Sequence, residues 1–207
     1  MNTSVRVPVD RLGRWVENFT ARHGETTLSV AEGRLDGRAA DGSWFGAVPP
    51  FSVRYDGAAE VAEFAGSCSP PVDWGILLVR KGGFAVARLS GAQVVASKVG
   101  QRHVQGRTKA GGQSQQRFAR RRDNQARVAY EAAADHTVRL IPDVPILVTG
   151  GDDAAVRAVL KDHRLGDLRG IPQPHLVDVA EPRRDVLDRA VLDACSVRID
   201  VTNAPAH

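Results

Sequence analysis

Gly111, Gly112 and Gln113 form a short segment whose residue types suit catalysis by positioning. Glycine has no Cβ and tolerates positive φ, so the pair can bring bare backbone close to another molecule. The carboxamide of Gln113 donates and accepts hydrogen bonds, but it is neutral and cannot serve as a useful general base. Such a segment can place a water molecule as nucleophile and donate a backbone N–H to a tetrahedral oxyanion. The chemistry that it suits is hydrolysis of an already activated ester.

Positive charge is concentrated beside this segment. Between Arg102 and Arg127 the sequence carries eight Lys or Arg residues and one acid, a formal charge of +7 in a chain whose net charge is +4. The rest of the chain therefore carries −3, and this confinement of positive charge predicts a polyanion as partner. The basic residues nearest the glycines are Arg107, Lys109, Arg117, Arg120, Arg121 and Arg122.

A long helix is predicted to carry the arginines that follow the glycines. Gly and Pro are absent from Ser114 until Pro142, and small or apolar residues recur on one helical face. That face is marked by Phe118, Ala126, Ala129 and Ala133.

The elements around the loop predict the fold. Residues 73–99 contain three apolar strands separated by KGG and SGA turns, the pattern of an antiparallel meander. Strands and helices then alternate, with strands at 145–149 and 175–179 and helices at 152–162 and 182–194. The predicted fold class is α+β, a mixed β-sheet with helices on its faces.

A smaller α/β subdomain is predicted at the N-terminus. Val9, Leu12, Trp15, Val16 and Phe19 recur at helical spacing before Gly24, a typical C-cap residue, and short strands follow. The prolines of GSCSPP, residues 66–71, favour a linker. We therefore expect two domains, residues 1–70 and 71–207.

The sequence GGQSQQRFARRR, residues 111–122, resembles the GGQ loop and following helix of archaeal and eukaryotic class I peptide-chain release factors. The similarity extends from about Val72 to the C-terminus, through the meander and LVTGGDDAAVRAVL. Ala110 departs from the usual GRGGQ run, and nothing resembles a codon-reading domain. This combination is similar to the release-factor-like rescue hydrolases of ribosome quality control, the VLRF family, including compact actinobacterial versions.

The resemblance implies an RNase H-like central domain and cleavage of peptidyl-tRNA on the large ribosomal subunit without codon recognition. Gly111 and Gly112 would shape the loop tip, and Gln113 would coordinate water while its N–H stabilises the oxyanion. Ser114 and Gln115 would support the loop. The arginines of the following helix, Arg117, Arg120, Arg121 and Arg122, would face ribosomal or transfer RNA.

The cysteine content and the hydropathy of the sequence argue against several other classes of protein. Two cysteines, Cys68 and Cys195, are too few and too far apart for a disulfide framework or a zinc site. No segment is long and apolar enough to span a membrane, so we expect a cytoplasmic monomer with no metal or cofactor. His103, a lone histidine, is interpreted as structural, and Asp152 as a helix N-cap.

Two alternative functions stay open at this point. One is a ribonuclease that cuts the acceptor end of tRNA. The other is a non-catalytic ribosome or RNA adaptor, which would bind through the arginines without using Gly111 to Gln113.

Overall fold

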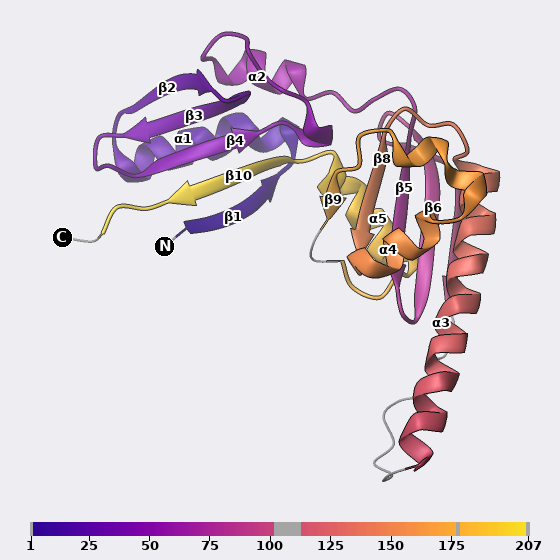
Figure 1. Ribbon diagram of the computed structural model, residues 1–207. Coiled ribbons are helices and arrows are strands. Elements are labelled where there is room, and N and C mark those ends of the chain that lie inside the picture. Colours follow the sequence, from indigo (N-terminus) through magenta and orange to yellow (C-terminus); the bar gives the residue numbers. More distant parts are fainter. Residues whose placement is uncertain (1, 102–112, 177–178, 206–207) are drawn as a thin grey trace. The chain divides into compact units, whose positions relative to one another are not determined.

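The computed structural model describes residues 2–101, 113–176 and 179–205 and divides into two compact units (Figure 1). The first unit comprises Met1–Pro70 and Leu192–His207, and the second comprises Pro71–Val191. The structure therefore differs from the sequence-based division at the C-terminal end. Residues 192–207, expected in the second domain, belong to the first unit because their strand pairs there.

The first unit is built on an antiparallel five-stranded sheet with the order β1-β10-β4-β3-β2. The C-terminal strand β10 lies between β1 and β4, with Ile199 opposite both Val5 and Ala47. Strands β1 and β10 were not predicted from the sequence. The strands are β1 (Asn2–Val7), β2 (Thr26–Ala31), β3 (Arg34–Ala39), β4 (Trp44–Val48) and β10 (Val197–Thr202).

Helix α1 (Leu12–His23) supplies much of the core of this unit. Phe19 and the buried Phe45 pack edge to face, with ring centroids 5.0 Å apart. The helix ends at His23. Gly24 follows as the C-cap, and its φ of 93° and its N–H bond to the Thr20 carbonyl confirm the predicted cap.

Helix α2 (Val61–Ser67) buries Phe64 and includes part of the segment predicted as a linker. Only residues 68–71 of the predicted linker follow this helix. Two short 3₁₀ helices, Val9–Arg11 and Pro50–Ser52, complete the described elements of the first unit.

The second unit contains a mixed sheet with the order β7-β6-β5-β8-β9. The first three strands form the predicted antiparallel meander, and β8 and β9 continue the sheet in parallel with β5. This order and polarity are those of an RNase H-like sheet. The strands are β5 (Trp74–Arg80), β6 (Gly83–Ser90), β7 (Gln93–Gln101), β8 (Leu147–Gly151) and β9 (His175–Leu176).

Helices α3 (Gln113–Leu140) and α4 (Asp153–Leu160) pack together on one face of this sheet. Leu77 and Val79 of β5 join their core, whereas Ile76 and Leu78, on the opposite face, are also fully buried. A strand buried on both faces requires cover on both, as in α/β sheets. The remaining helices are α5 (Arg184–Ala194) and two 3₁₀ turns, His163–Leu165 and Asp167–Arg169.

Within the described ranges, none of the helices combines the length and apolar character that crossing a membrane requires.

Candidate functional site

Helix α3 is the element that positions the predicted site. Its 28 residues correspond to a length of about 42 Å. The C-terminal half packs on β6 and β7, whereas the N-terminal half extends beyond the sheet (Figure 1). The end that begins at Gln113 is therefore the end farthest from the core of the second unit.

Small side chains allow the C-terminal half of α3 to lie close to the sheet. Ala129 and Ala133 are buried, as predicted from their spacing, and Ala134 joins them. The hydroxyl of Thr137, also buried, donates to the Ala133 carbonyl at 2.8 Å, so no polar group is left unpaired there. Of the other two predicted positions, Ala126 is half-buried, and the Phe118 side chain falls outside the described part of the chain.

The predicted site residues divide into two groups. Arg107, Lys109, Gly111 and Gly112 lie outside the described residues, as does His103. The others lie in the first three turns of α3, where the structure describes the backbone alone. These are Gln113, Ser114, Gln115, Arg117, Arg120, Arg121 and Arg122.

The start of α3 at Gln113 has an electrostatic consequence. The first four N–H groups of an α-helix lack acceptors within the helix, and the helix dipole makes this end positive. The first turn of α3 contains no acidic residue. The backbone amides that follow the two glycines can therefore stabilise negative charge on an external acceptor.

An ion-pair network ties α3 to the turn after α4. Arg164 donates to Asp135 of α3 and to Asp162, each at 2.7 Å. Its hydrogen bonds hold the pKa of Asp162 well below the usual value for aspartate. Because Arg164 and Asp135 are exposed, their ion pair contributes little to the stability of the fold.

The Asp152–Asp153 pair after β8 caps a helix. Asp152 Oδ1 accepts from the backbone N–H groups of Ala154 and Ala155 at 3.0 and 3.4 Å, which confirms the N-cap interpretation. Among the described residues, no group of three His, Cys, Asp or Glu side chains is placed to hold a metal ion.

His23, Asp41 and Ser43 bring together the residue types of a hydrolase triad in the first unit. However, Asp41 Oδ2 and Ser43 Oγ both contact Nδ1 of His23, at 2.9 and 3.1 Å, whereas a triad uses the two ring nitrogens separately. Ser43 is buried, and its Oγ accepts from the Ala204 N–H. This cluster therefore joins α1, the β3–β4 turn and the C-terminal segment.

The structure adds a feature that sequence reasoning missed, a hollow of about 560 Å³ between α3 and α4. Its apolar lining includes Ala126, Ala134, Ala158, Val159 and part of Tyr130. We call this feature the α3–α4 hollow.

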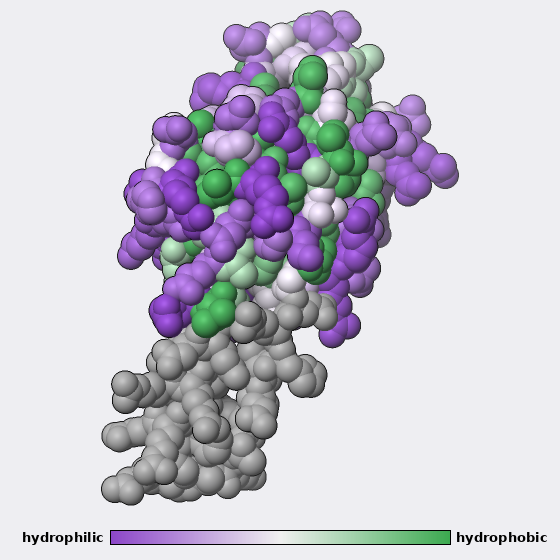
Figure 2. Space-filling view, turned by 90° about the vertical axis from the view of Figure 1, so that its right-hand side faces the viewer, coloured by the Kyte–Doolittle hydropathy of each residue, from purple (hydrophilic) through white to green (hydrophobic). Residues whose placement is uncertain are grey.

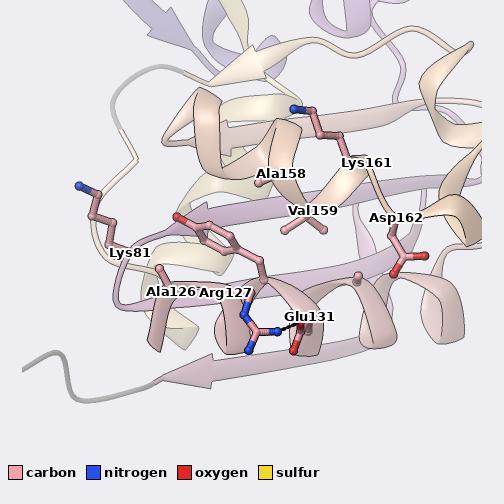
Figure 3. A pocket seen from close by; sticks show the side chains of 10 residues that line it. Lys81, Ala126, Arg127, Glu131, Ala158, Val159, Lys161 and Asp162 are labelled. Atoms are coloured by element: carbon pink, nitrogen blue, oxygen red, sulfur yellow. Dashed lines mark hydrogen bonds and ion pairs between the residues drawn. The ribbon is translucent and has the colours of Figure 1, made fainter. Parts of the chain in front are cut away.

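Charged groups stand around the α3–α4 hollow (Figure 3). Lys81 comes from the β5–β6 turn and Lys161 from the residue after α4, and the two lie on different sides of the hollow. On the α3 side, Arg127 pairs with Glu131. No sequence signal links these residues, because three separate elements supply them.

Comparison with protein families gives a match that covers nearly all of the second unit and continues into the C-terminal segment of the first. The model of the family described as Actinobacteria/chloroflexi VLRF1 release factor matches residues 72–200. The chain belongs to this family. The VLRF1 match covers the meander, the loop segment, α3 and the strands and helices after it, which agrees with the resemblance noted from the sequence.

The comparison with solved structures gives weak matches, of which we give two. One is the archaeal translation termination factor aRF1, at 16% identity and a TM-score of 0.37, over 93% of this chain and 64% of that one. Another is Archaeoglobus fulgidus Pelota, at 13% identity and a TM-score of 0.31, over 93% of this chain and 62% of that one. The VLRF1 chain thus spans less than two thirds of either protein. The comparison with curated proteins gives no match.

Proposed function

We propose that this VLRF1 release factor hydrolyses the ester of peptidyl-tRNA on stalled ribosomes or split large subunits, without codon recognition. The supporting observation is that α3 begins at Gln113, directly after Gly111 and Gly112, and extends beyond its sheet. A helix that presents its N-terminal amides at the far end of an arginine-rich segment suits an ester attached to RNA. The proposed location is the cytoplasm, and the proposed form is a monomer.

In this mechanism water is the nucleophile. Gly111 and Gly112 give the backbone room to approach the ester, and Gln113 orients the water and donates its N–H to the oxyanion. Ser114 and Gln115 support the first helical turn. Arg107 and Lys109, together with the arginines of α3, hold the RNA phosphates and fix the approach without reading sequence.

Large subunits that carry labelled peptidyl-tRNA provide the test. Wild-type protein releases the peptide, whereas Gly112→Ala or Gln113→Ala slows release by about 10²-fold, the cost of misplacing reacting groups by about 1 Å. Co-sedimentation with the subunits should be unchanged in both variants. Equal release by all three proteins would refute ester hydrolysis through this loop. A released tRNA that lacks its 3′ nucleotides would instead identify a ribonuclease.

A further inference from the structure

We infer that the α3–α4 hollow binds an unpaired nucleotide of large-subunit ribosomal RNA. The inference rests on the proposed function and adds a second RNA contact, at the C-terminal half of α3. Its size, about 560 Å³, lies within the range of about 300–1,000 Å³ typical of small-ligand sites.

The apolar lining suits a base. Tyr130 is half-buried and packs partly against the core, and alanine and valine side chains of α3 and α4 line the rest. Stacking on an aromatic ring is the usual way in which proteins hold a single-stranded base without reading its identity. Burial raises the pKa of the Tyr130 phenol, so its hydroxyl stays protonated and can donate a hydrogen bond.

The charges suit a phosphate. Both acids of the hollow face arginines, since Glu131 pairs with Arg127 and Asp162 with Arg164. Lys81 and Lys161 are exposed, and neither ammonium makes a hydrogen bond or ion pair within residues 2–101, 113–176 and 179–205. One nucleotide can therefore place its base against the apolar lining and its flanking phosphates near the two lysines.

The position along α3 sets the hollow apart from the proposed ester site, and we take the ribosomal RNA along the helix as the occupant. The hollow spans Ala126 to Ala134, which lie 13 to 21 residues after Gln113, or about 20–30 Å along the helix axis. If the ester of peptidyl-tRNA is at Gln113, RNA beside the hollow is RNA that lines the path of α3. The surface seen from the α3 side mixes many hydrophilic residues with smaller hydrophobic areas (Figure 2).

Cross-linking identifies the occupant directly. Full-length wild-type protein is bound to large subunits carrying peptidyl-tRNA, irradiated with ultraviolet light and digested with trypsin and nuclease. We expect ribosomal RNA nucleotides on the peptide of residues 128–139, which contains Tyr130. Cross-links of this peptide to tRNA or to a ribosomal protein, or its recovery without any cross-link, would overturn the inference.

Salt dependence tests the lysines. In Lys81→Gln/Lys161→Gln, two phosphate contacts are lost, and the slope of log affinity against log salt should become shallower by about 1.4, or 0.7 per contact on a single strand. The control is Arg169→Gln, which removes one exposed charge of the second unit outside the hollow and should leave the slope within about 0.3 of wild type. An unchanged slope in the double variant would contradict the inference.

Variants at Tyr130 test stacking. Tyr130→Leu keeps apolar volume but loses the ring face, and affinity for the subunit should fall about fivefold or more, whereas Tyr130→Phe should bind within about twofold of wild type. Thermal unfolding of each variant shows whether a loss of affinity is caused by misfolding. Peptide release by saturating wild-type protein reports the proposed hydrolysis separately. If wild-type protein cross-links at Tyr130 but releases no peptide, the RNA site in the hollow stands and the proposed hydrolysis is refuted.

Discussion

His136 of α3 stacks on Phe84 of β6, with ring centroids 5.6 Å apart and ring planes inclined by 29°. Phe84 in turn lies over Gly100 of β7, where a Cβ would come within 2.4 Å of the ring. The contact fixes the C-terminal half of α3 to β6 and β7, the last two strands of the meander. It therefore helps to determine where the opposite end of the helix points.

The His136–Phe84 contact predicts a pH-dependent stability. Burial, followed by Arg139 and Lys98, lowers the pKa of His136, and Asp135 opposes this in part. Between the two pKa values the unfolded chain binds more protons than the folded one, so stability is present above the ordinary histidine pKa and is lost as the pH falls from that value through the lower pKa of the folded state. When the pH is lowered from 7.5 to 5, the melting temperature of the wild type should fall by more than that of His136→Phe. Parallel pH profiles for the two proteins would contradict this.

Gly100 should be intolerant of even one methyl group. Gly100→Ala inserts a Cβ against the Phe84 ring and should cost about 1–3 kcal/mol in the free energy of unfolding, as overpacked sites do. Gly13→Ala is the control, because its Cβ meets nothing within 4 Å and the change, in the first turn of α1, should not destabilise the fold. In denaturant titrations, Phe84→Leu should relieve part of the Gly100→Ala cost. Strict additivity of the two changes would argue against the clash.

The arginines after the loop should contribute affinity rather than catalysis. Neutralising Arg120, Arg121 and Arg122 with glutamine should make the salt slope of subunit binding shallower by about 2, while release at saturating protein stays near wild type. Arg11, Arg14 and Arg22, exposed residues of the first unit, offer a control with the same change in charge. If both triple variants alter the slope equally, the effect comes from net charge and not from a local contact.

The two adjacent aspartates before α4 should differ in their contribution to stability. Asp152→Ala removes the cap of α4 and should cost about 0.5–2 kcal/mol. Asp153→Ala removes an exposed pair with Arg157, four residues along the helix, and should cost about 0.3–0.5 kcal/mol. Equilibrium unfolding of both variants measures the difference. A larger loss in Asp153→Ala would show that the capping geometry contributes little.

Much of the second unit could be predicted from the sequence, because hydrophobic periodicity and the positions of Gly and Pro each act within a single helix or strand. The absence of Gly and Pro after Ser114 predicted α3, and the buried Ala129 and Ala133 follow its helical period. The loop chemistry stays a prediction, which rests on residue type and order at 111–113. Of these residues, Gly111 and Gly112 lie outside the described part of the chain.

Features that depend on contacts between distant parts of the chain could not be predicted from the sequence. Strand β10 has an ordinary apolar alternation in VRIDVT, but its position between β1 and β4 is set by partners early in the sequence. The α3–α4 hollow has the same origin, because Lys81, Tyr130 and Lys161 become neighbours only through the packing of three elements. No single window of sequence contains either arrangement.

The position of β10 also bears on how this protein is made. Strands β1 and β4 emerge from the ribosome early, yet the strand that separates them is synthesised after the whole second unit. Until then both carry unpaired backbone edges that can join other extended chains. The second unit can fold during synthesis, whereas the first is completed only near the end of translation. A nascent copy cut short before Val197 would therefore be prone to aggregate while its RNase H-like half is already formed.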